Sequence, residues 1–267
     1  MLLNRILTAV IGVPLIFICI YCGNVAFYIM MFIISFLCVY ECLTILKKYN
    51  PHTIVSLIMA SLFFVFIYFF NSTMIDKVAF SAIIMIFILF FVEVVFCENP
   101  SFSIERIAIS FFGAFFIPLA LLYMSYIRNL DNGMKFIFFL FIVVWVLDTA
   151  AYGFGILFGQ HELAKDISPK KTIEGTIAGI VFGILTAYLC RYVFMQDVLT
   201  ITESLMLGFV IAIIGQFSDL AESLIKRDAN IKDSGKIIPG HGGVFDRFDS
   251  YIFVAPTVYY YILLFLK

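Results

Sequence analysis

Long runs of apolar residues separated by short polar segments dominate this chain. From Ile6 to Tyr40 there is no charged residue, and about 20 apolar residues are enough for a helix to span a bilayer. This stretch has room for two spans that meet at Cys22-Gly23-Asn24. Along the whole chain the pattern predicts nine transmembrane helices, near residues 5–22, 25–46, 54–70, 78–97, 107–128, 136–158, 173–193, 204–226 and 250–266. The third run is short, which predicts a tilted helix or a locally thinner bilayer.

Composition and the form of these runs favour one fold class. The chain is 63% hydrophobic and only 13% charged, whereas soluble domains are about a quarter charged. The runs show no strict alternation, so helices are favoured over a β-barrel. Since no linker, low-complexity tract or internal repeat divides the chain, we predict an all-α polytopic integral membrane protein with a single domain over residues 1–267.

Lysine and arginine are distributed unevenly between the two ends of the predicted helices. With nine spans, one face receives twelve basic residues and the other face receives five. Because cytoplasmic loops carry an excess of basic residues, the richer face is predicted to be cytoplasmic. The polar segments 159–172 and 227–249 then lie together on that side. Arg5 precedes an apolar run as in a signal peptide, but no small-residue cleavage site follows it.

The six cysteines lie inside or at the ends of apolar runs, at positions 19, 22, 38, 42, 97 and 190. Cys19 and Cys22 form a CxxC pair, but no second pair of Cys or His stands at zinc spacing. The cysteines are therefore interpreted as small hydrophobic residues, with no disulfide and no zinc site. Glu41 and Glu93 are interpreted as interfacial residues or packing partners.

Four polar residues near the end of the run at 204–226 share one helix face. Asp219, Glu222, Ser223 and Lys226 stand at i, i+3, i+4 and i+7, which places them on a single stripe. Asp219 lies seven residues deeper than Lys226, roughly 10 Å at 1.5 Å per residue. An ionised carboxylate there needs an ion pair, water or a bound cation. Two interpretations stay open: a structural Asp219–Lys226 ion pair, and a metal and phosphate site.

The segment that follows favours the second interpretation. Asp246 and Asp249 stand three apart at the start of the last helix, so both can face one cavity with Asp219. Mg²⁺ binds through one or two carboxylates and completes its shell with water and phosphate oxygens. Glycines at 235, 240, 242 and 243 allow a close approach of the backbone, and cationic donors are supplied by Lys226, Arg227, Lys232, Lys236 and Arg247. A lone histidine such as His241 is more typical of a structural or exposed residue.

A second basic cluster is predicted on the same face. In Ser168-Pro169-Lys170-Lys171-Thr172, the serine suits an N-cap and the proline suits the first helical position. Free amides at that helix end, with two lysines, predict an anion site. Asp148 and Tyr152 stand four apart on the preceding helix. Asp148 is equally consistent with a hydrogen-bonded helix partner and with a site residue.

One long pattern joins these residues. It consists of Ser223, Ile225, Lys226-Arg227, Lys232-Asp233, Gly235, Ile238-Pro239, His241-Gly242-Gly243, Asp246-Arg247 and Asp249. This pattern resembles that of the phosphatidate cytidylyltransferases, also called CDP-diacylglycerol synthases. Ser218 stands where members of that family usually carry glycine. The resemblance covers about residues 145–256 as a catalytic part, while residues 1–144 match only in being hydrophobic and form a variable helical part.

The resemblance implies that CTP and phosphatidate react in the bilayer to give CDP-diacylglycerol and pyrophosphate, with magnesium required. It also allows a second cation and a homodimer, and it places the protein in the cell (inner) membrane with its site facing the cytoplasm. The implied metal ligands are Asp219, Asp246 and Asp249. The implied catalytic residues are Asp219, Asp246, Lys226 and Ser223. The implied substrate-binding residues are Lys170, Lys171, Arg227, Lys232, Lys236, His241, Gly242, Gly243, Arg247 and Asp148.

Two other functions stay open at this stage. Polytopic proteins with carboxylates inside the membrane often transport ions, although transporter sites usually lie near the midplane between inverted repeats. A related enzyme could use CTP on another lipid, such as an isoprenoid glycerol phosphate or a polyprenol. Binding of nucleic acid has no support, because the sequence predicts no soluble basic domain.

Overall fold

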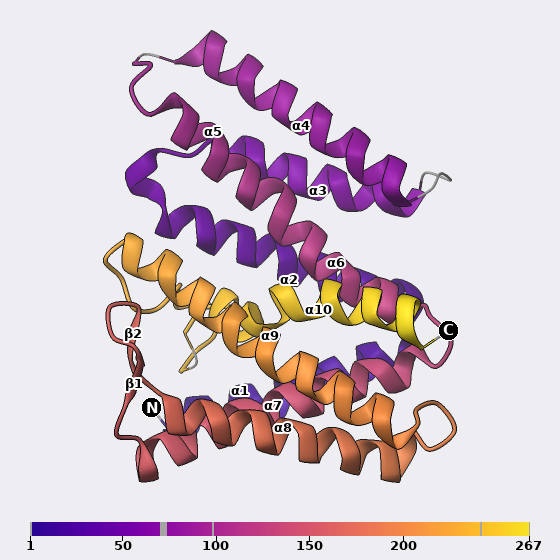
Figure 1. The fold of residues 1–267 in the computed structure, drawn as a ribbon. Helices are drawn as coiled ribbons and strands as arrows, with labels where there is room; N and C mark the ends of the chain where they lie inside the picture. The colour runs from indigo at the N-terminus through magenta and orange to yellow at the C-terminus, as the bar shows by residue number, and fades with distance from the viewer. Residues whose placement is uncertain (1, 70–73, 98, 241, 267) are drawn as a thin grey trace.

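The computed structural model describes residues 2–69, 74–97, 99–240 and 242–266 as a bundle of helices (Figure 1). Seven helical segments are long and apolar enough to cross a membrane, and two shorter apolar segments lie at Val10–Cys22 and Thr53–Phe69. The predicted class, an all-α polytopic membrane protein, is confirmed. In chain order the helices are α1 Leu2–Cys22, α2 Asn24–Ile45, η1 Lys47–Tyr49, α3 Thr53–Phe69, α4 Met74–Phe96, α5 Ser103–Phe111, η2 Phe112–Phe116, α6 Ile117–Arg128, α7 Gly133–Phe158, α8 Ile173–Phe194, α9 Ile201–Asp228 and α10 Phe245–Phe265.

The predicted helix near residues 107–128 contains an irregular turn. Segment η2 is a π-helical turn between α5 and α6, in which the Ile117 amide donates to the Phe112 carbonyl, five residues back. Pro118 follows directly and has no amide hydrogen to continue the α-helical ladder. A π-turn keeps the neighbouring amide bonded at this point. The sequence pattern of apolar residues gave no indication of it.

The start of the helix after residue 168 was predicted wrongly. Segment Ser168–Thr172 forms strand β2, which pairs antiparallel with β1, Glu162–Ala164. Thr172 is the N-cap of α8, and its Oγ1 accepts a hydrogen bond from the Gly175 amide at 3.2 Å. The backbone before it is extended because its hydrogen bonds go to β1 rather than into a helix. Lys170 and Lys171 therefore lie on a hairpin at the end of the bundle.

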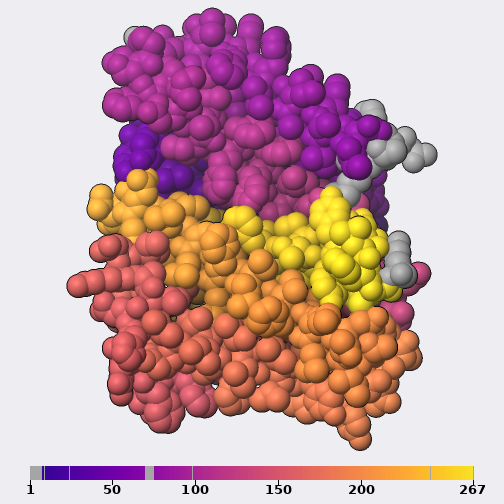
Figure 2. Space-filling model, viewed as in Figure 1, coloured from indigo at the N-terminus to yellow at the C-terminus, as the bar shows by residue number. Residues whose placement is uncertain are grey.

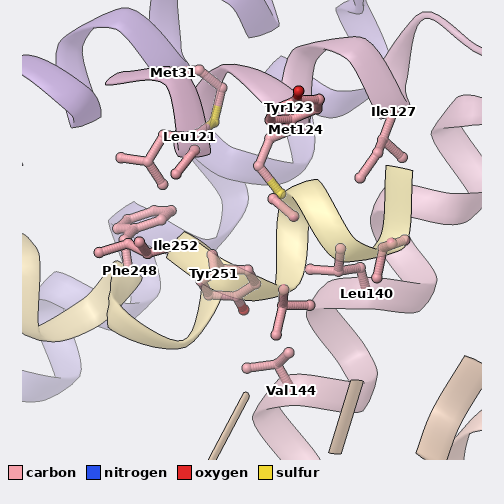
Figure 3. Close-up of a cluster of buried hydrophobic side chains, with 14 of the residues drawn as sticks. Met31, Leu121, Tyr123, Met124, Ile127, Leu140, Val144, Phe248, Tyr251 and Ile252 are labelled. Atoms are coloured by element: carbon pink, nitrogen blue, oxygen red, sulfur yellow. The ribbon is translucent and has the colours of Figure 1, made fainter. Parts of the chain in front are cut away.

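Helix α10 joins the two halves of the chain. Its side chains Phe248, Tyr251 and Ile252 are buried and lie among residues of α2, α6 and α7, including Met31 and Leu140 (Figure 3). Helix α10 also packs against α9. In the space-filling view it forms a band between the amino-terminal helices and α8 and α9 (Figure 2). The division into domains is not tested by this packing and stays a prediction.

The two long polar segments lie at the same end of the bundle (Figure 1). The Arg227 Nε atom, at the end of α9, donates a hydrogen bond to the Ile167 carbonyl of the hairpin at 2.9 Å. Many large apolar side chains elsewhere on the helices are exposed, such as Ile83, Val94 and Leu189, as expected for a surface that faces lipid. This arrangement brings the polar chemistry to one end of an apolar bundle.

Candidate active site

The polar stripe on α9 forms a network of ion pairs that the sequence did not predict. The Lys226 Nζ atom lies 2.5 Å from Glu222 Oε2 and 3.0 Å from Asp246 Oδ1. Asp219 pairs instead with Lys171 of β2, at 2.6 Å. The alternative of a structural Asp219–Lys226 pair is therefore not what the structure contains. Lys171 of β2 thus pairs with a carboxylate of α9, while Lys226 of α9 pairs with Glu222 on its own helix and with Asp246 of α10.

Three carboxylates form an acidic cluster at the centre of this network. Ligand atoms of Asp219, Glu222 and Asp249 all lie within 4.8 Å of one another. Both Glu222 carboxylate oxygens are buried and make no hydrogen bond among the described residues, and one of them is paired with Lys226. Hard oxygen donors with unused lone pairs suit a divalent cation. The residues therefore fit such an ion, and Glu222, which we did not predict as a ligand, belongs to the set.

Asp246 lies beside this cluster but is held by the loop between α9 and α10. Its carboxylate accepts hydrogen bonds from the Ser234 amide at 3.0 Å and from the Gly243 amide at 3.0 Å, besides the contact with Lys226. Through these hydrogen bonds Asp246 anchors the loop to the start of α10. Asp246 does not belong to the group of described carboxylates that approach one another within 4.8 Å, and its role as a metal ligand stays a prediction.

A polar cavity lies between α7, β2, α8 and α9. It has a volume of about 360 Å³, and its lining includes Asp148, Tyr152, Lys170, Lys171 and Asp219. The structure thus brings together the two constellations that the sequence showed separately. Two lysines in its wall, together with Asp219 of the acidic cluster, suit a polyanion that carries a metal ion.

An apolar groove lies on the opposite side of α9. Its volume is about 730 Å³, and apolar side chains of α5, η2, α9 and α10 form most of its wall, including Ala108, Phe112 and Phe253. Ser218 and Glu222 also line this groove, whereas Asp219 lines the polar cavity. The acidic cluster therefore borders both spaces. We did not predict the groove, because its walls come from helices that only tertiary packing brings together.

The other residues that the sequence predicted for the site belong to α9, to α10 or to the loop between them. Ser223 is buried on α9. Arg227 uses its guanidinium within the loops, where it donates to Ile167 and Ile231 carbonyls. The remaining predicted cationic residues, Lys232, Lys236 and Arg247, are exposed. His241 lies outside the described residues.

Gly242 offers a test of the loop geometry. Its φ of +87° is one that L side chains rarely adopt, and an added Cβ would lie 2.9 Å from Asp246 Oδ2. We expect Gly242→Ala to lower activity about tenfold or more. The backbone strain of about 1–3 kcal/mol would displace Asp246, which anchors the loop. Activity of the purified variant, normalised to its folded fraction, measures this. Gly12→Ala is the control, because nothing lies within 4 Å of that position; equal activity of both variants would contradict the prediction.

The fold and the site define a class of protein: a polytopic membrane protein whose buried carboxylates and lysines suit phosphate chemistry. The chain belongs to the cytidylyltransferase family, which it matches over residues 3–265. It is therefore a CTP-dependent nucleotidyltransferase. This confirms the resemblance drawn from residues 145–256 and extends it over the amino-terminal half.

Three relatives illustrate the match. The chain is 32% identical over 268 residues to the phosphatidate cytidylyltransferase of Bacillus subtilis, and the alignment covers 98% of each chain. It is 44% identical over 136 residues to that of Staphylococcus epidermidis, covering 51% of this chain and 52% of the relative. It is 43% identical over 139 residues to that of Synechocystis, covering 52% of this chain and 47% of the relative.

Proposed function

We propose that this protein transfers the cytidylyl group of CTP to phosphatidate, giving CDP-diacylglycerol and pyrophosphate. The observation that supports this most is that the acidic cluster borders both the polar cavity, with its two lysines, and the apolar groove. Such a site can receive a polyanionic nucleotide from one side and a lipid from the other. The names of the relatives support the same reaction. The excess of basic residues at this end supports a site that faces the cytoplasm.

Asp219, Glu222 and Asp249 are proposed to hold Mg²⁺. When bound, Mg²⁺ supplies positive charge that neutralises the phosphate oxygens and favours attack at phosphorus. Lys171 stands beside Asp219 and Lys226 beside Glu222. These lysines place two ammonium groups at the edge of the cluster, where they can bind the phosphates of the two substrates.

The reaction needs no general base. A phosphate monoester has a second pKa of about 6, so the lipid phosphate is mostly dianionic at neutral pH. One of its oxygens forms a bond to the α-phosphorus of CTP. The bond from that phosphorus to the bridging oxygen breaks, and pyrophosphate leaves with the electron pair. The chain's contribution is to position two polyanions and to stabilise the charge of the transition state.

The apolar groove is proposed to bind an acyl chain of phosphatidate. The groove extends to Glu222 and is lined mostly by apolar side chains, and an acyl chain is the apolar part of the proposed substrate. Ala108 is exposed on α5 and lines the groove. We expect Ala108→Trp to raise the KM for dioleoyl phosphatidate about tenfold, because each methylene that loses its apolar contact costs about 0.8 kcal/mol.

The groove prediction has a matched control. Ala79 is exposed on α4 and does not line the groove, so Ala79→Trp should leave this KM unchanged. The turnover number of Ala108→Trp with a short-chain phosphatidate should also be unchanged. An unaltered KM for dioleoyl phosphatidate in Ala108→Trp would place the acyl chains elsewhere.

The proposed reaction is tested with purified protein in detergent, phosphatidate, MgCl₂ and CTP labelled at the α-phosphate. Label should enter the lipid fraction, label at the γ-phosphate should appear in pyrophosphate, and EDTA should stop both. Activity without sealed vesicles would speak against a transporter. If no label enters phosphatidate while an isoprenoid glycerol phosphate or a polyprenol accepts it, the lipid acceptor is the wrong one. The homodimer stays a prediction from the resemblance.

A further inference from the structure

Glu41 of α2 reaches the loop between α9 and α10. Its side chain is buried, with 2% of the residue exposed. The Glu41 Oε2 atom accepts a hydrogen bond from Ser234 Oγ at 3.1 Å and another from the Phe245 amide at 2.8 Å. An interfacial residue or a simple packing partner, as the sequence suggested, would not make two hydrogen bonds to residues about 200 positions away. The contacts link the amino-terminal half to the site.

The loop has glycine where the carboxylate of Glu41 passes. A Cβ at Gly235 would overlap Glu41 Oε1, and a Cβ at Gly243 would overlap Glu41 Oε2 and Ser234 Oγ. Two separate parts of the loop therefore close around one carboxylate, and the first residue of α10 is bonded to it. Gly235 and Gly243, which the sequence suggested for a close approach of the backbone to a ligand, here leave room for the Glu41 carboxylate.

Hydrogen bonds lead from Glu41 to the site in two steps. The Ser234 hydroxyl that donates to Glu41 also accepts from the Asp246 amide at 3.3 Å, and the Ser234 amide donates to the Asp246 carboxylate at 3.0 Å. Asp246 in turn lies 3.0 Å from Lys226 Nζ. Asp246 is thus one of the two carboxylates that hold Lys226, and Asp246 is itself held by a loop that is folded around Glu41.

We propose that Glu41 is a positioning residue for the reaction, which sets the geometry of Asp246 and Lys226 from outside the catalytic half of the chain. The proposal rests on the proposed function, since it concerns the same site. It gives the amino-terminal helices a role in catalysis. Among the described residues, Glu41 is not part of the acidic cluster of Asp219, Glu222 and Asp249.

The central experiment compares Glu41→Ala and Glu41→Gln. Glu41→Ala removes two hydrogen bonds to a charged group that hold the loop, so its kcat should fall about tenfold to a hundredfold. The Mg²⁺ concentration for half-maximal activity should stay within about twofold of wild type, because the acidic cluster is untouched. Glu41→Gln keeps one acceptor oxygen for both donors and should recover most of the kcat.

Two further measurements separate positioning from general support of the fold. Hydrogen–deuterium exchange in segment 229–244 should be faster in Glu41→Ala and close to wild type in Glu41→Gln. Ser234→Ala should lower kcat by a smaller factor, and adding it to Glu41→Ala should lower kcat no further, since contacting residues are not additive. If Glu41→Ala does not fold, the same kcat and exchange measurements are made on Ser234→Ala and Gly243→Ala, which should show changes in the same direction.

Glu93→Gln is the matched control. Glu93 is also a buried carboxylate of the amino-terminal half, paired with His52 at 2.6 Å and Arg106 at 3.1 Å. Its variant should leave kcat of the folded protein and exchange in segment 229–244 unchanged. The proposal is overturned if Glu41→Ala keeps the wild-type kcat, if it raises the Mg²⁺ requirement as a ligand variant would, or if stability falls without any change in the loop. A wild-type protein that fails to label phosphatidate would instead count against the proposed function.

Discussion

Replacement of Asp219 by asparagine is expected to lower kcat about a thousandfold. The change keeps the shape of the side chain but removes a charge from the acidic cluster, and loss of one electrostatic contact at a reacting centre typically costs a factor of about 10² to 10³. It also leaves Lys171, whose Nζ atom lies 2.6 Å from Asp219 Oδ2 and is buried, without its carboxylate. The Mg²⁺ concentration for half-maximal activity should rise in any residual reaction.

A second aspartate–lysine pair provides the control for Asp219→Asn. Asp197 lies 2.8 Å from Lys135, with 70% of its side chain exposed, at a distance from the site along the chain and outside both cavities. Asp197→Asn should keep full activity. The activity of both variants is measured as the transfer of label from α-labelled CTP into the lipid fraction. Wild-type turnover by Asp219→Asn, with the same Mg²⁺ requirement, would remove Asp219 from the proposed metal site.

Replacement of Lys226 by methionine is expected to lower both activity and stability. Lys226 holds Glu222 and Asp246 together, and its side chain is only 12% exposed. Without the lysine, Glu222 and Asp246 lose the ammonium group that pairs with both of them, and breaking a largely buried pair in this way costs about 3–5 kcal/mol. Thermal unfolding in detergent should occur several degrees lower, and transfer to phosphatidate should be almost lost.

Two further variants test whether the loss of the lysine charge causes the lower stability of Lys226→Met. Lys48 pairs with Asp228 at the surface, at 3.2 Å and with nearly half of each side chain exposed, so Lys48→Met should change stability by less than about 1 kcal/mol. Adding Glu222→Gln to Lys226→Met should restore part of the thermal stability, because one buried charge is removed. A Lys226→Met protein as stable as wild type would show that these carboxylates do not need the lysine.

The polar stripe of α9 could be predicted because it depends on one helix only. A period of 3.6 residues decides that Asp219, Glu222 and Lys226 share a face, whatever lies opposite. The partners could not be predicted in the same way. Asp219 is bonded to a strand that the sequence interpretation assigned to a helix, and that error arose because Ser168-Pro169 suits a helix start as well as it suits a hairpin.

The site shows the same limit. Motif spacing located Asp246, Asp249 and Lys171, but it did not show that Glu222 stands with Asp219 and Asp249 while Asp246 turns to the loop. Glu41 was interpreted as an interfacial residue or a packing partner, because it stands near the end of an apolar run. A glutamate within an apolar run near the end of a predicted helix was the available signal, since burial of a carboxylate in lipid needs a polar partner.

The sequence by itself determined the class of the protein, the approximate helices, the polar end of the bundle and the family. These follow from the transfer of apolar segments to lipid, from helical period and from residue spacing, which are all local properties of the chain. Only the tertiary structure decided which carboxylates meet, where an apolar groove opens and how α2 contacts the loop. Those features depend on packing between helices, and the distance in sequence between Glu41 and Phe245 carries no information about their contact in space.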